Sequence, residues 1–299
     1  MGLNMNREIE LMEKMSSFRR RHVGIAGSCP GSKKLPVASP KPTGQKVLML
    51  YLLHNRLPYT KKTLPPLLAT DFSPHSVRIA VINNGSNNDT LQYLKTLKDP
   101  KMILINTGRN MNIGKAYNQG LKLRRPREYI FRGANDFIFT KKGWLNELLE
   151  AFNYLPNAGQ VGHRFKDWRY KNPNGRPKIQ SMGKATVTKL PKQDAWEVIG
   201  IPGVALYSPM VWNRLGKFYD SSAIARFAGL EPSERIKIMG LKNYMIKVSE
   251  GSACEHIERM PSEFPEDQVR ASYKQHWGEY SKMIEDYIAG RRTIYLGKP

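Results

Sequence analysis

The chain has 299 residues, 40% of them hydrophobic, which suffices for one large α/β domain with appendages or for two small domains. Its net charge of +23 favours polyanionic partners, namely nucleic acid, an anionic membrane surface or a phosphorylated substrate. Two cysteines exclude a disulfide framework, and no apolar run approaches the length of a membrane span. Because Glu8, Glu10 and Glu13 stand where a signal peptide needs an apolar core, we expect a soluble, cytoplasmic protein.

Residues 1–45 are expected to form an appendage. A short helical pattern ends in Arg19-Arg20-Arg21, and residues 23–45 are rich in Gly, Ser, Pro and Lys. This composition is typical of a flexible basic linker or arm. Two interpretations stay open: an arm that grips a polyanion, and a tail without a task.

From Lys46 onward, apolar runs alternate with helical patterns. We predict strands at the apolar runs 47–53, 77–82, 102–105 and 129–133, and helices over 59–68, from Asp89 to Leu97, and over 115–123. Continuous apolar runs indicate strands that are covered on both faces. The prediction is therefore an α/β fold with a mostly parallel, Rossmann-like sheet flanked by helices.

The second half of the chain is less regular. Helices are predicted over 144–154 and 209–215, strands near 161–163 and 245–248, and a terminal helix over 265–289. Residues 164–193 are polar and basic, which indicates a functional or a disordered loop. We expect three parts: a basic helix and linker (1–45), the α/β domain (46–260) and a C-terminal helical extension (261–299).

Polar turns follow three of the predicted strands. They are His54-Asn55-Arg56, Asn83-Asn84-Gly85-Ser86 and Ala134-Asn135-Asp136. In a doubly wound sheet such strand ends converge on one crevice, so we expect a ligand site there. A lone carboxylate at Asp136 can hold a divalent cation that in turn holds a diphosphate. The alternative for Asp136 is ordinary Asx-turn chemistry.

An ordered set of segments resembles the family-2-like glycosyltransferases with the GT-A fold. Leu52 to Tyr59 is similar to that family's opening strand and Tyr-Asn-Arg turn, and Ile82 to Thr90 to its Val-Asp-(Asp/Asn)-Gly-Ser-Thr-Asp-Gly-Thr motif. Asn106 to Gly120 resembles its Asn-x-Gly…Ala-x-Asn-x-Gly segment, and Ala134-Asn135-Asp136 occupies the place of its DxD motif. Pro202 to Tyr207, followed by Leu215 to Asp220, resembles its acceptor-side segment.

The resemblance implies transfer of a sugar from a nucleotide-diphospho sugar to a hydroxyl group with help from Mn²⁺ or Mg²⁺. Asp136 and His256 would be the metal ligands, and Asn83 and Asn84 would face the nucleobase. The residues implied to bind the nucleotide sugar are His54, Asn55, Arg56, Asn83, Asn84, Gly85, Asn112, Gly114, Lys115, Asn118, Asn135 and Asp136. Relatives usually carry acidic residues where this chain has Asn83 and Asn135.

Inverting transfer needs a general base that deprotonates the acceptor hydroxyl. In the family this residue is acidic and sits near the start of a helix after the acceptor-side segment. Gly229 to Ile236 resembles the family's Glu-Asp-x-Asp-Leu segment, so Glu231 is the first candidate and Glu234 the second; Asp220 is also possible. The alternative for Glu231 is a carboxylate that stabilises a helix N-terminus.

Three hypotheses describe the acceptor. The first is an enzyme, of bacteriophage type, that glycosylates a hydroxylated base in DNA. Its support is the charge and a segment where cations and aromatic residues alternate, as expected for nucleic-acid binding: Arg164, Lys166, Trp168, Arg169, Tyr170 and Lys171. The second is a transferase of surface polysaccharide or lipid-linked glycan held at an anionic membrane surface. The third is a non-catalytic nucleic-acid-binding protein with the same fold.

Overall fold

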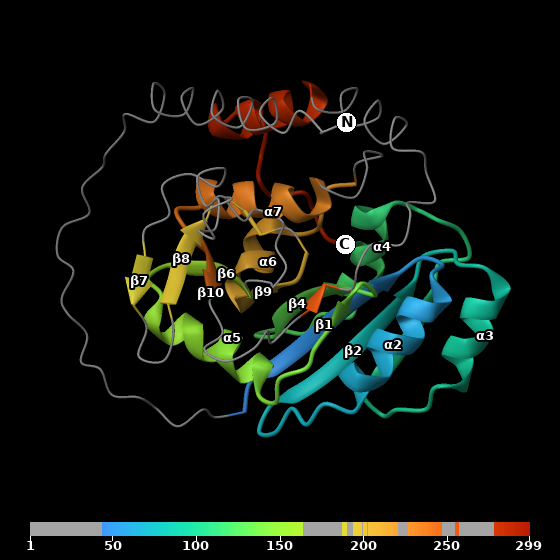
Figure 1. Ribbon diagram of the computed structural model, residues 1–299. Helices are drawn as coiled ribbons and strands as arrows, with labels where there is room; N and C mark the ends of the chain where they lie inside the picture. The colour runs from blue at the N-terminus through green and yellow to red at the C-terminus, as the bar shows by residue number, and fades with distance from the viewer. Residues whose placement is uncertain are drawn as a thin grey trace, which may run out of the picture.

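The computed structural model describes residues 44–163, 187–189, 194–198, 200–201, 203–220, 227–246, 255–256 and 278–299. Its centre is one sheet with the strand order β3-β2-β1-β4-β9-β6-β10-β8-β7, covered by helices (Figure 1). A two-stranded ladder of β11 and β5 stands apart from that sheet. The predicted α/β class with a mostly parallel sheet is confirmed.

The first four strands of the sheet are parallel and lie in the order β3-β2-β1-β4. Their bounds are Lys46–Leu53 (β1), Ser76–Asn83 (β2), Met102–Asn106 (β3) and Tyr129–Ala134 (β4). Each prediction for these strands is correct to within a residue or two, because strands buried on both faces appear in the sequence as unbroken apolar runs.

The other half of the sheet contains strands of both directions. Their bounds are Ala158–His163 (β6), Val187–Lys189 (β7), Asp194–Val198 (β8), Ala205–Tyr207 (β9) and Lys242–Ile246 (β10). Strand β9 is antiparallel to β4 and β6, and β8 is antiparallel to β10. The small ladder pairs Phe137–Ile138 (β5) with Glu255–His256 (β11).

Helices cover both faces of the sheet. The bounds are Leu57–Leu68 (α2), Asn88–Thr96 (α3), Ile113–Leu121 (α4), Trp144–Tyr154 (α5), Pro209–Leu215 (α6) and Phe227–Ile238 (α7). Side chains alternate across β1: Met49 and Tyr51 pack with α2 and α5, whereas Leu48 and Leu50 pack with α4 and α6. Each face of the sheet therefore has its own apolar cluster, and the two clusters together hold the strands and helices in place.

A third apolar cluster lies outside the sheet. Residues 278–288 form a helix, and Tyr280, Met283, Ile284 and Tyr287 pack against Tyr219 and the C-terminal tail. The predicted terminal helix is confirmed over that range, and the earlier part of the prediction lies outside the described residues. In the described part of the chain, no helix is both long and apolar enough to cross a membrane. The predicted arm over 1–45 lies in residues that the structure does not describe, apart from its last two.

Candidate active site

The turns after β1 and β2 are bonded to each other at the carboxyl edge of the sheet. His54 Nδ1 lies 2.9 Å from the Asn84 carbonyl oxygen, and the Asn55 amide donates to Ser86 Oγ at 2.8 Å. Asn55 Oδ1 in turn accepts from the Asn87 amide at 2.9 Å. Both Asn55 and Arg56 have positive φ, which turns the chain sharply into α2. The structure thus brings together the first two predicted binding segments.

A network of asparagine amides joins the β2 turn to the loop after β3. Asn83 Nδ2 donates to Asn106 Oδ1 at 3.1 Å. Asn84 Nδ2 donates to Asn110 Oδ1 at 3.1 Å, and Asn84 Oδ1 accepts from the Met111 amide at 3.0 Å. Both Asn83 and Asn84 are buried. Their side chains therefore hold the loops after β2 and β3 together, and a direct contact with a nucleobase stays a prediction.

Close backbone packing supports the same loops. Gly85 has φ of 70°, and a Cβ there would lie 2.1 Å from the Arg109 carbonyl carbon. Any side chain at this position would force the two loops apart, so glycine is required by both conformation and space. The exposed Arg109 is held beside the β2 turn by this contact.

Asn135 and Asp136, adjacent in the sequence, differ in environment. Asn135 is buried, and its Nδ2 donates to Thr60 Oγ1 of α2 at 3.1 Å. Its backbone amide donates to the Leu52 carbonyl at 3.1 Å. Asp136 is half-buried and lies at the end of the strand. The structure therefore gives Asn135 an architectural role that an acidic residue could not fill without losing the Nδ2 donor.

Two buried tyrosines surround the end of β4. Tyr51 OH is hydrogen-bonded to Thr63 Oγ1, and Tyr117 OH donates to the Gly133 carbonyl at 2.9 Å. Burial raises the pKa of both phenols, and the charge of Asp136 adds to the rise in each case. Both phenols therefore stay protonated, and Tyr117 donates to the backbone of β4.

The ladder of β5 and β11 carries His256 to the same strand end. In its register His256 pairs with Phe137, the residue after Asp136, and Figure 1 shows β11 in orange beside that edge. A carboxylate and an imidazole are oxygen and nitrogen donors that suit Mn²⁺, and a cation that also binds a diphosphate needs few protein ligands. Among the side chains described, no group of three or more His, Cys, Asp or Glu residues could hold a metal. The assignment of Asp136 and His256 as metal ligands stays a prediction.

Helix α4 packs against residues 218–220, in the segment that resembles the family's acceptor side, through Gly114 on its first turn and Asn118 one turn later. Asn118 Nδ2 donates to Asp220 Oδ1 at 2.8 Å, and Asn118 Oδ1 accepts from the Phe218 amide at 2.8 Å. A Cβ on Gly114 would lie 2.0 Å from the Tyr219 carbonyl oxygen. Asn112, with φ of 69°, is the N-cap residue, and Lys115 is exposed on the first turn. These predicted residues thus lie together with Asp220, whose carboxylate also accepts from Lys217 at 3.0 Å.

The two glutamates predicted as catalytic bases lie in the interior of α7. Glu231 is buried and forms an ion pair with Arg235, one turn later in the helix. Arg235 also donates to the carbonyls of Leu215, Lys217 and Ile294. Burial raises the pKa of Glu231, and Arg235 opposes that rise. Glu234 is buried next to Lys237. The contacts of Glu231 are those of a structural ion pair.

Several site features could not be predicted from the sequence, and some predictions lie outside the described part of the chain. The sequence alone assigns no role to Asn106, Asn110 or Arg132, although several asparagines follow the third predicted strand.

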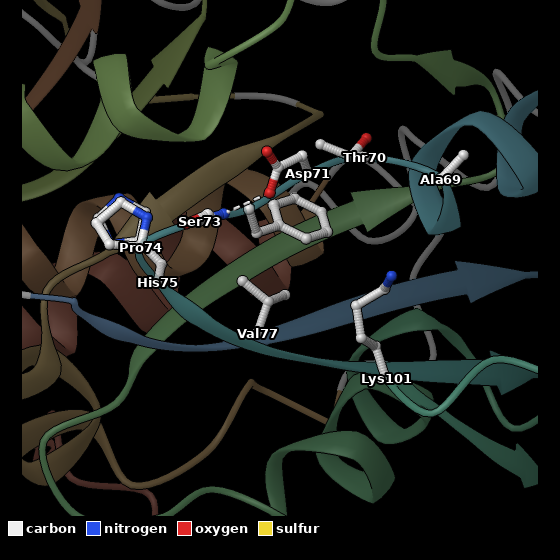
Figure 2. A pocket seen from close by; sticks show the side chains of 9 residues that line it. Ala69, Thr70, Asp71, Ser73, Pro74, His75, Val77 and Lys101 are labelled. Carbon is white, nitrogen blue, oxygen red and sulfur yellow. Dashed lines mark hydrogen bonds between the residues drawn. The ribbon is translucent and has the colours of Figure 1, made fainter.

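The predicted nucleic-acid-binding residues lie between 164 and 171, which the structure does not describe. A hollow of about 540 Å³ at the opposite edge of the sheet is lined by residues 69–75, Val77 and Lys101. Figure 2 shows the side chains that line it.

The glycosyl transferase family 2 model matches residues 52–215, from the end of β1 to the end of α6. The match includes the turns after β1, β2, β3 and β4, here called the amide-lined edge because asparagine side chains join them. The chain belongs to glycosyl transferase family 2. It is therefore a glycosyltransferase of the GT-A type, as the motifs at the strand ends predicted. A comparison with curated protein sequences gives no significant match.

Solved structures with the same fold include two metal-bound glycosyltransferases. One is the mannosyltransferase PcManGT from Pyrobaculum calidifontis in complex with GDP-Man and Mn²⁺, with 15% identity and a TM-score of 0.56; the match covers 94% of this chain and 74% of that one. The other is GalNAc-T7 with UDP, GalNAc and Mn²⁺, with 12% identity and a TM-score of 0.58. That match covers 81% of this chain and half of GalNAc-T7. At this identity the likeness concerns the fold.

Proposed function

We propose that this glycosyltransferase moves a sugar from a nucleotide-diphospho sugar to a hydroxylated base in DNA, with inversion at the anomeric carbon. The observation that carries the donor assignment is the position of Asp136 at the end of β4, one residue from the register partner of His256. The two solved structures described above hold Mn²⁺ with a nucleotide or a nucleotide sugar, which supports a donor of this class. Mg²⁺ is a second possible cation.

The donor is proposed to lie across the amide-lined edge. The crevice residues are His54, Asn55, Arg56, Asn83, Asn84, Gly85, Asn112, Gly114, Lys115, Asn118, Asn135 and Asp136. Arg56, Arg109 and Lys115 supply positive charge for the phosphates, while the amides hold the loops in place. Asp136 and His256 would hold the cation, which when bound neutralises charge on the departing nucleoside diphosphate.

We assign the general base to Asp220 before Glu231 and Glu234. Asp220 is exposed, whereas Glu231 and Glu234 are buried. Asn118 donates to Oδ1 and Lys217 donates to Oδ2, so the carboxylate is held in a defined orientation in which it could accept the proton of the acceptor hydroxyl. The roles of Glu231 and Glu234 as bases remain the alternative that substitution tests.

The DNA acceptor is supported by the charge of +23, because a polyanion is attracted by a field of that sign and size. The test is incubation with Mn²⁺, a panel of nucleotide sugars, and either hydroxymethylated or unmodified DNA, followed by nucleoside mass analysis. A sugar adduct on the hydroxymethylated base alone supports the proposal. Transfer only to a lipid-linked acceptor would favour membrane glycan synthesis, and DNA binding without turnover of any donor would favour a non-catalytic role.

A further inference from the structure

A buried arginine lies in the middle of β4, among residues that otherwise pack in the apolar interior. Arg132 is 2% exposed, and its neighbours on the strand, Ile130 and Phe131, belong to the two apolar clusters. A charged side chain in this position is stable only if its N–H groups find acceptors. The acceptors identify the task of the residue.

Arg132 binds the backbone that leads into β9. Its Nε donates to the Gly203 carbonyl at 2.9 Å and its Nη2 to the Ile201 carbonyl at 2.8 Å. Its guanidinium also lies 6.0 Å from the centre of the Tyr207 ring, on β9. These two carbonyls flank Pro202, in the segment that resembles the acceptor side of the family.

The same backbone is held from two further directions. The Ile201 amide donates to Ser233 Oγ of α7 at 3.3 Å. Gly203 has φ of 80°, and a Cβ on it would lie 2.8 Å from Cζ of Phe137. Phe137 is the residue directly after Asp136 and pairs with His256. This backbone is therefore bound by Arg132 of β4, the strand that leads to Asp136, and is packed against Phe137, the residue after Asp136.

We propose that Arg132 is a positioning residue that fixes Ile201 and Gly203, on the proposed acceptor side, relative to the proposed metal-binding strand end. The inference rests on the proposed function for what the two parts bind. Irregular backbone inside a protein needs hydrogen-bond partners, and here one guanidinium on β4 supplies two of them. Strand β4 thereby links the position of the proposed metal ligand Asp136 to the position of the backbone proposed to bind the acceptor. Without the link, the donor still binds, but the acceptor hydroxyl is placed less accurately.

The test compares Arg132→Met, Arg132→Lys and Gly203→Ala in the full chain. A small misplacement of the acceptor hydroxyl lowers the rate of transfer steeply. In Arg132→Met and Gly203→Ala we therefore expect the KM for the acceptor to rise about 10-fold or more, or the kcat for transfer to fall by about that factor. Hydrolysis of the donor by water is expected to stay within about 3-fold of wild type, because it needs no positioned acceptor. Arg132→Lys should restore part of the loss, since one donor remains.

Ile130→Val is the matched control, because it trims a buried side chain two residues away on β4 that has no polar contact with the segment. Hydrogen exchange of the amides at 203–207 gives a readout that needs no substrate, and it should accelerate in the Arg132 and Gly203 variants only. Equal losses of donor hydrolysis and transfer, or unchanged exchange in Arg132→Met, would overturn the inference. If Arg132→Met does not fold, Gly203→Ala carries the same test from the Phe137 side. Absence of any donor turnover in the wild type would count against the proposed function and leave the exchange result to decide this inference.

Discussion

The edge proposed to bind the donor (the turns after β1, β2 and β4, here the donor edge) and the part proposed to bind the acceptor (the backbone around Gly203 and Phe218, here the acceptor side) are stabilised in different ways. At the donor edge, loops that follow successive strands bind each other through neutral amides such as Asn83, Asn84 and Asn135. On the acceptor side, buried charges bind backbone carbonyls far away in the sequence, as Arg132 and Arg235 do. The neutral amides join the loops around Asp136 without adding further negative charge that would repel a diphosphate, whereas the buried guanidiniums hold backbone segments together on the acceptor side.

The largest expected effect is the loss of activity in Asp136→Asn. The variant keeps the shape of the side chain but removes the charge needed to hold a divalent cation, so turnover should fall at least about 100-fold. The measurement is donor hydrolysis and transfer across a range of Mn²⁺ concentrations. Asp71→Asn, in the hollow at the opposite edge, is the control and should retain full activity. Normal turnover in Asp136→Asn would refute the metal assignment.

Substitution of the acidic candidates separates a catalytic role from a structural one. Glu231→Gln breaks a buried ion pair and should lower the free energy of unfolding by about 3 kcal/mol, because Arg235 then lacks its counter-charge. Asp220→Asn should lower kcat about 100-fold or more while leaving the melting temperature nearly unchanged. Thermal melts and kcat of both variants decide the matter. The reverse result, a stable but inactive Glu231→Gln, would return the base role to Glu231.

A pH-dependent loss of stability is expected from His163, at the end of β6. Burial, with a smaller effect from the charge of Lys141, lowers its pKa from 6.5 to about 3. Between pH 6.5 and 3 the imidazole of His163 therefore stays neutral in the folded protein but takes up a proton in the unfolded chain. The free energy of unfolding is thus unaffected by His163 above pH 6.5 and falls as the pH drops from 6.5 towards 3. At pH 5 the loss should be about 2 kcal/mol. Urea titrations of wild type and His163→Phe at pH 8 and 5 test this, and an equal loss in both would contradict it.

The smallest effect concerns the amide network. Asn84→Ala removes bonds to Asn110 and to the Met111 amide, which should lower stability by about 1–2 kcal/mol and raise the KM for the donor. The exposed Asn88, which bonds only Gln92 within the same helix, gives the control Asn88→Ala. Initial rates against donor concentration provide the measurement. A donor KM equal to that of the control would show that the network does not shape the donor site.

The contrast between the two regions also explains what the sequence could reveal. The donor edge was predictable because its strands are unbroken apolar runs and its turns follow them directly, so Asp136 and the Asn83 turn could be placed on one edge. Arg132 could not be interpreted, because its partners Ile201 and Gly203 lie about 70 residues away and join it only in three dimensions. Glu231 was expected near a helix start, but α7 begins at Phe227 and Arg235 takes its carboxylate.

The ladder between β5 and β11 has a consequence for how the enzyme is made. Among the described residues, strands β1 to β4 pair with one another and with β9, so most of the strand pairing at the proposed donor edge involves residues early in the chain. His256 reaches its partner Phe137 only after more than a hundred further residues have been added. On a ribosome, which releases the N-terminal part first, the loops proposed to bind the nucleotide can therefore form before His256, the second proposed metal ligand, has been synthesised. A nascent chain would then carry a shaped but still incomplete catalytic centre.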